Sequence, residues 1–310
     1  MTSEETQKKM TLKELASDSE KVKIINRVFH DWDADAYEDE HPEIYELERE
    51  SWKDLTNGIL APIMRKENLT LLDVGTGNGF VIDVIAPYIA PSQTIVFTDI
   101  SEKMIGVVTD KFKNHAFKKE FVVCEAARIP RPDASVDIIT VNSVLHHIPN
   151  YEEFLVEARR LLSPGGALII KHEPSIRFPQ NTVLRSLYLS LNKIKGRGRS
   201  SVAQPIDPLL AGALLREGIE FAEPITKYDL QALIDIGSPT ASGGMDVERG
   251  FDPYKIVTEV FPTAKTSRIT SYAYLGKYNE QKNMATRLVS TILKMLFPKD
   301  GYLFDLIVIT

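Results

Sequence analysis

The segment "LLDVGTGNGF", Leu71–Phe80, joins an apolar strand pattern directly to three glycines at alternate positions. Glycine loses much backbone entropy on folding, so such a cluster is typical of places where a ligand or another chain segment comes close to the backbone. A glycine turn between a strand and a helix directs backbone N–H groups toward a ligand. The spacing G-x-G-x-G, with Phe80 three positions after Gly77, differs from the dinucleotide fingerprint G-x-G-x-x-G. The segment predicts the start of an α/β core, although a tight structural turn is an alternative explanation.

Short aliphatic runs and helix-like segments alternate after this loop. Apolar runs of this length, bounded by turn residues, predict strands that are buried on both faces of a parallel sheet. The alternation predicts right-handed crossovers and a doubly wound α/β fold. The predicted strands are 71–74, 94–98, 121–124, 136–141 and 167–171, with helices at 79–89, 101–117 and 151–162. "SPGG", Ser163–Gly166, predicts a break between the last helix and its strand.

The flanking segments differ in composition, so four units are predicted. They are an N-terminal helical cap (1–66), a cofactor-binding core (67–175), an inserted substrate cap or lid (176–265), and C-terminal strands and a sheet-covering helix that complete the core sheet (266–310). The first unit contains ten carboxylates between Asp31 and Glu50. These acids are expected to pair with the basic helix predicted in the inserted unit.

Bulk composition narrows the class of protein. The chain has 310 residues, of which 43% are hydrophobic and 26% charged, and a formal net charge of −6. These values indicate a packed globular protein and argue against general attraction to nucleic acid. A single cysteine, Cys124, excludes internal disulfides. The first 21 residues lack an apolar signal region, and no run reaches the length of a membrane span. We therefore expect a cytoplasmic protein.

Polar residues follow the ends of successive predicted strands. Asp99 ends the second strand, twenty residues after Gly79, where an acid can accept hydrogen bonds from both hydroxyls of a ribose. Glu125 follows the third strand, and "VNSVLHHIPN", 141–150, ends the fourth. Because open α/β sheets bind ligands at the carboxyl ends of their strands, these groups predict one ligand site.

Four segments together resemble class I S-adenosylmethionine-dependent methyltransferases, in the small-molecule branch (methyltransferase type 11) that includes quinone-pathway enzymes. They are "LLDVGTGNG", "IVFTDISEKM", "VVCEAARIPRPDASVDIITVNSVLHHI" and "ARRLLSPGGALII", and they cover about residues 69–172. The resemblance implies a Rossmann-like, mostly parallel seven-stranded sheet. It also implies the cofactor S-adenosyl-L-methionine, with S-adenosyl-L-homocysteine as product.

The resemblance also implies roles for individual residues. Asp73 and the glycine loop would hold the methionine part of the cofactor, Asp99 the ribose, and Glu125 with Ala126 the edge of the adenine. The complete set of implied cofactor-binding residues is Asp73, Gly75, Gly77, Gly79, Asp99, Ile100, Met104, Glu125, Ala126 and Asn142. Glu125 and Cys124 depart from the more frequent Asp and Gly of the family.

Three residues are candidates for catalysis. His147 lies where the family faces the transferred methyl group, and its ordinary pKa suits proton removal. Glu173, in "KHEPS", is a candidate for substrate binding, and Tyr37 for covering the methyl donor. Packing or helix capping is an alternative role for each. No metal site is predicted, because the calcium-like "DWDADA" lacks the required glycine and later acid, and only one histidine would match the family's metal position.

An insertion of this length predicts an enclosed small-molecule substrate. We therefore expect methyl transfer to a small, partly apolar metabolite by in-line displacement, with the methylated atom undetermined. A non-catalytic S-adenosylmethionine-binding sensor or scaffold is the alternative. The amphipathic, basic segment 181–199 is predicted to pack as a cap, with peripheral membrane contact as the less favoured interpretation. The oligomeric state is not predicted.

Overall fold

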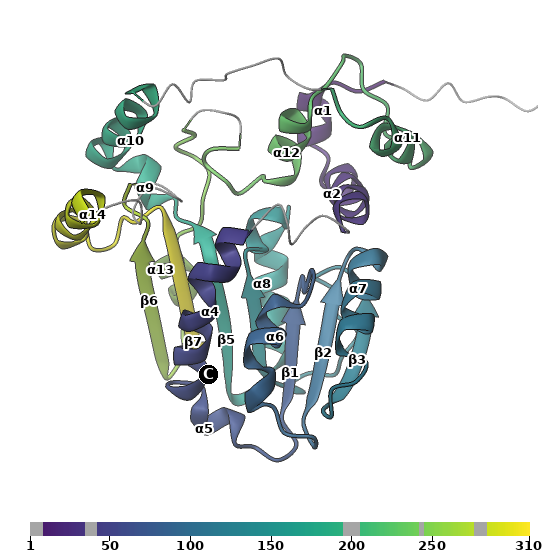
Figure 1. Cartoon of the computed structure of the whole chain (residues 1–310), viewed down its shortest axis with the longest axis vertical. Helices are drawn as coiled ribbons and strands as arrows, with labels where there is room; N and C mark the ends of the chain where they lie inside the picture. Colours follow the sequence, from purple (N-terminus) through teal and green to yellow (C-terminus); the bar gives the residue numbers. More distant parts are fainter. Residues whose placement is uncertain (1–8, 35–41, 195–204, 242–244, 276–283) are drawn as a thin grey trace, which may run out of the picture.

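The structure is a computed structural model, and it describes residues 9–34, 42–194, 205–241, 245–275 and 284–310. A central sheet carries helices on both faces, and further helices lie above the carboxyl ends of its parallel strands (Figure 1). Among the described residues, no helix combines the length and the hydropathy that crossing a bilayer requires.

The sheet has seven strands in the order β3-β2-β1-β4-β5-β7-β6. β7 runs antiparallel to both of its neighbours, and the other neighbouring pairs are parallel. The predicted doubly wound, mostly parallel seven-stranded sheet is therefore confirmed. The strands are β1 (Thr70–Val74), β2 (Thr94–Asp99), β3 (Lys118–Val123), β4 (Val136–Asn142), β5 (Leu162–Pro174), β6 (Thr266–Tyr272) and β7 (Leu303–Ile309).

The predicted break at Ser163–Gly166 is only partly correct. The preceding helix does end at Leu161, but β5 begins at Leu162 and includes the whole "SPGG" segment. The register between β4 and β5 shifts between Val136 and Ile138. The segment stays in the sheet because Gly165 and Gly166 hydrogen-bond to Thr310, at the end of β7. Long-range pairing thus decided a conformation that local turn chemistry left open.

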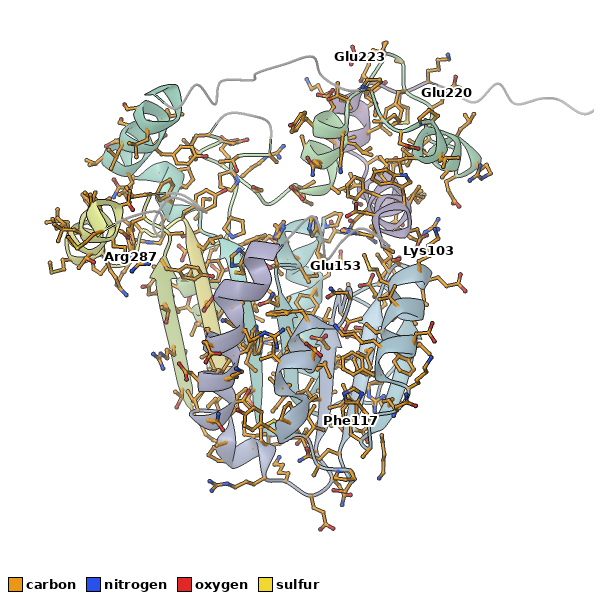
Figure 2. The ribbon with its side chains drawn as sticks, in the orientation of Figure 1. Lys103, Phe117, Glu153, Glu220, Glu223 and Arg287 are labelled. Atoms are coloured by element: carbon orange, nitrogen blue, oxygen red, sulfur yellow. The ribbon has the colours of Figure 1, made fainter. Side chains whose placement is uncertain are left out.

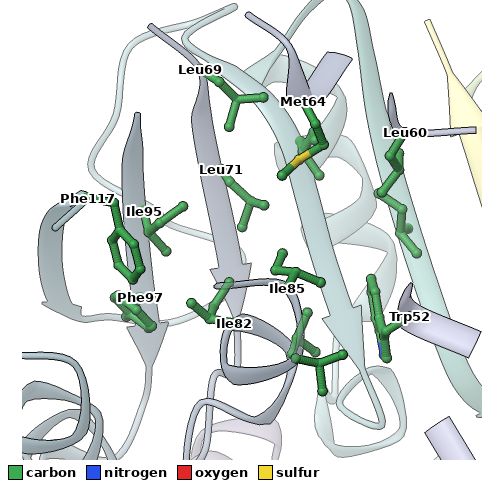
Figure 3. Packing of buried hydrophobic residues seen from close by; sticks show 14 of the residues in the cluster. Trp52, Leu60, Met64, Leu69, Leu71, Ile82, Ile85, Ile95, Phe97 and Phe117 are labelled. Carbon is green, nitrogen blue, oxygen red and sulfur yellow. The ribbon is translucent and has the colours of Figure 1, made fainter. Parts of the chain in front are cut away.

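Two hydrophobic clusters hold helices against the sheet. On the face shown in Figure 3, buried side chains of the sheet such as Leu71 and Phe97 pack against Trp52 and Ile82. The helices of this face are α4 (Pro42–Asn57), α5 (Ala61–Met64), α6 (Phe80–Ile85), followed by the short η1 (Ala86–Tyr88), and α7 (Glu102–Phe112). On the opposite face, the second cluster joins α8 (Tyr151–Leu161) and α13 (Pro253–Val260) to the sheet.

Two groups of helices lie above the carboxyl ends of the strands (Figure 1). One group shares a core containing Leu15, Phe29, Leu214 and Leu233, and the other a core containing Leu184 and Leu293, so each group joins segments far apart in the sequence. The first group is α1 (Leu12–Ala16), α2 (Ser19–Asp33), α11 (Pro208–Arg216) and α12 (Lys227–Ile234); the second is α9 (Arg177–Gln180), α10 (Thr182–Ile194) and α14 (Met284–Leu296).

This arrangement bears on the predicted units, whose boundaries stay predictions. α14 was expected to cover the sheet; its buried Leu293 shares a cluster with α9 and α10 and with Tyr272 and Leu303, at the ends of β6 and β7. The predicted pairing of the N-terminal acids with the basic helix is not found among the described residues. There, Asp31 accepts a hydrogen bond from Ser101, and Glu48 forms an ion pair with Lys171.

Candidate functional site

The glycine loop leaves β1 and leads into α6, and its three glycines have different surroundings. Gly75 and Gly77 line a cavity at the carboxyl ends of β1, β2 and β4. Gly77 has a φ of +52°, and a Cβ added there would meet no atom within 4 Å. Gly79 does not line the cavity; an added Cβ would lie 2.5 Å from the ring of Phe112 on α7. Open space at Gly77 therefore suits a ligand, whereas Gly79 allows close helix packing.

Asp73 lies at the base of this cavity, near the end of β1. Its two carboxylate oxygens accept hydrogen bonds of 2.6 Å from the hydroxyls of Thr76 and Thr140. Burial, which disfavours the charged form, raises the pKa of Asp73 to about 6 despite these hydrogen bonds, and the nearby Asp99 acts in the same direction. A bound cation, such as an ammonium group, would favour the charged carboxylate here.

Asp99, the last residue of β2, connects the glycine loop to the following helix. One oxygen accepts from the Gly77 N–H at 3.0 Å and the other from the Ser101 N–H at 2.9 Å. Ser101 caps α7, as its sequence position predicted, by accepting from the Met104 N–H. Burial raises the pKa of Asp99, and its backbone hydrogen bonds oppose that shift. Each oxygen has acceptor capacity left for a hydroxyl group.

The far side of the cavity contains the residues implied for adenine. Ile100, Met104, Glu125 and Ala126 all line it. The Glu125 carboxylate also accepts a 2.7 Å hydrogen bond from the ammonium group of Lys23. Burial disfavours a charged lysine, but the hydrogen bonds to Glu125 and Glu20 outweigh it and raise the pKa of Lys23. This ion pair holds α2 across the cavity.

Helix α2 contributes three lining residues that sequence reasoning missed. Lys23, Asn26 and His30 lie on one side of the helix, at spacings of three and four residues, and all line the cavity. A polar stripe at that spacing is the signal that could have identified them. Asn26 is 8% exposed, and its side-chain oxygen has no hydrogen-bond partner among the described residues.

These observations test whether the residues suit S-adenosylmethionine. The cofactor needs space near the glycine loop, acceptors for its hydroxyls and ammonium group, and an apolar surface for adenine. Gly77 leaves that space, Asp99 and the unpartnered oxygen of Asn26 are acceptors, and Met104 is a buried apolar wall. The donor set therefore fits the cofactor, and the roles of individual residues stay proposals.

Asn142, at the end of β4, also lines the cavity. Its side-chain oxygen accepts a 3.1 Å hydrogen bond from the indole N–H of Trp52 on α4. The ammonium group of Lys171 lies 5.2 Å from the centre of the same indole ring and forms a buried ion pair with Glu48. Trp52 thus orients the Asn142 amide, whose nitrogen is left as a donor.

His147 follows β4 in the short helix η2 (Leu145–His147) and lines the same cavity. Its Nδ1 lies 3.1 Å from a carboxylate oxygen of Asp235 and 3.2 Å from the Ile234 carbonyl. Burial, together with the neighbouring His146, lowers the pKa of His147 to about 4, although Asp235 opposes the shift. The imidazole is therefore neutral near pH 7. Asp235 comes from the insertion, and no sequence motif identified it.

Glu173 lies beneath η2 and is fully buried. Its carboxylate accepts hydrogen bonds from the backbone N–H groups of Val144, Leu145 and His146, and it lies 2.8 Å from Nδ1 of His146. These four contacts favour a role in positioning η2 over direct contact with a substrate. Tyr37, the third catalytic candidate, lies outside the described residues.

The groups around the histidine pair have the composition of a cation site. One ligand atom each from His146, His147 and Asp235 lies within 4.8 Å of the others. However, Nδ1 of each histidine already contacts a carboxylate, Glu173 for His146 and Asp235 for His147. The prediction that the protein binds no metal remains a prediction, which chelation can test.

A second cavity, of about 250 Å³, lies beside the first and beneath the insertion. His146 lines the second cavity and His147 the first, and their ring centres are 4.1 Å apart. His172 is 4% exposed, and its Nε2 has no hydrogen-bond partner among the described residues. The lining residues are His146, His172, Pro174, Tyr228, Gln231, Asp235, Ser238, Thr240, Ala241, Tyr302 and Leu303. We call this the acceptor cavity.

The fold and the first cavity define a class of protein, and comparison with known families agrees. Residues 72–170 match the family described as "Methyltransferase domain". Over these residues the chain therefore has the sequence of a methyltransferase domain, and the strand order given above agrees with the fold that the sequence resemblance implied. The predicted methyltransferase domain is therefore confirmed over residues 72–170, and its family uses S-adenosylmethionine.

Particular relatives cover only part of the chain. The ubiquinone/menaquinone biosynthesis C-methyltransferase UbiE of Cupriavidus metallidurans is 30% identical over 119 residues, which are 38% of this chain and 48% of that protein. UbiE of Brucella anthropi is 30% identical over 164 residues, or 52% of this chain and 62% of that protein. The chain thus spans about half the length of the curated relatives it matches.

Solved structures show weaker similarity. A SAM-dependent methyltransferase from Aquifex aeolicus has a TM-score of 0.34 and 20% identity, covering 55% of this chain and 87% of that one. The CurJ carbon methyltransferase has a TM-score of 0.43 and 16% identity, covering 81% of this chain and 51% of that one. The fold description rests on the strand order given above.

Proposed function

We propose that the chain transfers the methyl group of S-adenosylmethionine to a small, partly apolar molecule held in the acceptor cavity. The observation that carries this proposal is the 4.1 Å distance between the ring centres of His146, which lines the second cavity, and His147, which lines the first. A protein that only binds the cofactor does not need a second small-molecule cavity beside it. The separation of a donor site from an acceptor site favours catalysis by positioning.

The chain's own residues would prepare the acceptor. When bound, the cofactor supplies an electrophilic methyl group attached to a sulfonium. The Ile234 carbonyl accepts a hydrogen bond from Nδ1 of the neutral His147 ring, with the Asp235 carboxylate 3.1 Å from the same nitrogen, so Nε2 can accept a proton. Glu173 fixes the backbone of η2, and therefore the position of both histidines. A nucleophile that loses a proton, either a hydroxyl or a carbon activated by one, suits this arrangement.

The lining of the acceptor cavity supports an acceptor with one polar end. Histidine, carboxylate, amide and hydroxyl groups predominate, and none of the described lining residues is Lys or Arg. A phosphate or carboxylate on the acceptor would therefore lack a cationic partner. Tyr302 and Leu303 connect the cavity to the apolar cluster of α9 and α10, where an apolar end can pack. The relatives named as C-methyltransferases are compatible with an activated carbon as the nucleophile.

The proposal is tested by measuring S-adenosylhomocysteine formed from S-adenosylmethionine with a panel of phenols and hydroxylated ring compounds. His147→Gln and Asp235→Asn should reduce turnover by about 100-fold or more, because general-base catalysis commonly contributes that much. Glu223→Gln is the matched control, since Glu223 is an exposed acid of the same insertion, at the upper edge of Figure 2. Cofactor binding without turnover on any acceptor would instead support a sensor or scaffold.

A further inference from the structure

Helix α14 turns an apolar surface outward. Its buried positions Ser290 and Leu293 form one stripe toward the rest of the protein, and Leu293 belongs to the cluster shared with α9 and α10. On the opposite side, successive turns expose large apolar side chains. These are Met284 (86% exposed), Leu288 (62%), Val289 (42%), Ile292 (44%), Met295 (71%) and Leu296 (64%).

An exposed surface of this kind indicates a partner. Single exposed apolar residues are common on proteins, but a contiguous apolar stripe marks an interaction site. α14 lies at the outer edge of the molecule beside α10 (Figure 1), and α10 adds the exposed Val183 and Leu189. We name α14 with these two side chains of α10 the outer apolar face. Among the described residues, nothing covers its exposed side chains.

The charges next to this face identify the partner. α10 and α14 together contain four basic residues and no acid, in a chain whose net charge is −6. Arg287, which Figure 2 shows at the edge of the molecule, and Lys294 lie along one flank of the α14 stripe. An apolar stripe with cations along one flank, on helices that contain no acid, is typical of helices that lie in the surface of an anionic bilayer.

We propose that the outer apolar face binds the surface of a membrane containing anionic phospholipid. With 13 residues, α14 is too short to span a bilayer but long enough to lie in its interface. A second copy of the chain fits less well, because two such faces would bring their cations together, and the helices have no acid to pair with them. This surface is independent of the methyl-transfer proposal, since none of its residues lines either cavity.

The test is sedimentation of the purified full chain with two kinds of vesicle, phosphatidylcholine alone and phosphatidylcholine mixed with phosphatidylglycerol. We expect binding to the mixed vesicles, which salt weakens. The double variant Leu288→Glu/Met295→Glu should lower the partition coefficient at least about tenfold, because two apolar side chains are lost from the interface. Arg287→Gln/Lys294→Gln should lower the preference for anionic vesicles by about tenfold.

The matched control is Leu209→Glu, because Leu209 is 77% exposed on α11, outside the proposed face. It should bind vesicles as the unchanged chain does. Thermal unfolding and cofactor binding report whether each variant is folded. If Leu288→Glu/Met295→Glu does not fold, the vesicle preference of Arg287→Gln/Lys294→Gln tests the proposal instead. Absence of vesicle binding, or equal binding by the Leu288/Met295 variant, would overturn the proposal. Self-association that the same variant abolishes, without vesicle binding, would assign the face to a second copy.

Discussion

Replacing Asp99 by alanine should weaken cofactor binding strongly. The carboxylate holds the Gly77 N–H at 3.0 Å and the Ser101 N–H at 2.9 Å, and its remaining acceptor capacity faces a cavity that it lines. Hydrogen bonds to a charged group are worth about 1.5–3 kcal/mol in such sites. Since about 1.4 kcal/mol is a tenfold change, the dissociation constant of S-adenosylmethionine should rise about 10- to 150-fold.

The same substitution leaves the buried Ser101 N–H and the half-buried Gly77 N–H without their acceptor. An unsatisfied buried N–H costs about 1–3 kcal/mol, so the free energy of unfolding should fall by about 1–3 kcal/mol for Ser101, and by less for Gly77, whose N–H water can reach. Titration calorimetry with S-adenosylmethionine and S-adenosylhomocysteine measures the affinity, and denaturant unfolding measures the stability. Asp99→Asn keeps one oxygen acceptor, so its affinity and its stability should both lie between those of the unchanged chain and those of Asp99→Ala.

The control is Asp110→Ala, which removes an exposed acid on α7 whose side chain is 84% accessible. It should change neither affinity nor stability by more than about 0.5 kcal/mol. A folded Asp99→Ala protein that bound the cofactor as tightly as the unchanged chain would refute the assignment of this cavity. If that variant does not fold, unchanged affinity in Asp99→Asn would count against the proposed contact with the ribose.

Three further predictions follow from the site. The pKa of His147 falls from 6.5 to about 4 on folding, so between these pH values the unfolded chain binds one more proton than the folded chain. Acidification from pH 7 to 4 should therefore lower the free energy of unfolding by up to about 3 kcal/mol. Denaturant titrations at several pH values should show that His147→Gln lacks this loss. Gly79→Ala should destabilise the protein by about 2 kcal/mol or more, because its φ is positive and the new methyl group meets Phe112. Gly77→Ala should cost only the strain of its positive φ, about 1 kcal/mol, and should also lower cofactor affinity. Equal losses of stability and of affinity in the two variants, measured by calorimetry, would contradict the different roles. Dialysis against EDTA should leave methyl transfer unchanged. A loss of activity that added Zn²⁺ restores would overturn the prediction that the protein binds no metal, and would make Asp235 and the histidine pair the first group to substitute.

Much of the lining of the first cavity was predictable because its residues lie at the ends of strands. Once the apolar runs predict parallel strands, the residues after them must meet at one edge of the sheet, so Gly77, Asp99, Glu125 and Asn142 line the same cavity. Gly79 was grouped with its neighbours by spacing alone. Its packing against α7 depends on how the helix lies over the loop, which spacing does not specify.

Residues from outside this core could not be placed in the same way. Helix α2 carries a stripe of Lys23, Asn26 and His30, but its docking over the cavity depends on the Lys23–Glu125 ion pair and on a core shared with α11 and α12. Similarly, Asp235 meets His147 only because the insertion folds back over η2. Contacts over such sequence separations are decided by packing of the whole chain, for which the sequence contains no local signal.

The parallel strands, the meeting of strand-end residues at one cavity and the motifs of the methyltransferase domain were determined by local patterns, because strand period, glycine spacing and strand-end acids act within a few residues. Only the tertiary structure decided the acceptor cavity, the neutral state of His147 and the outer apolar face of α14. The last example shows the physical reason. The sequence of an amphipathic helix shows where its apolar residues recur, but it does not show which side of the helix faces the protein. The docking of Leu293 into its cluster decides this, and it turns Leu288 and Met295 toward the solvent.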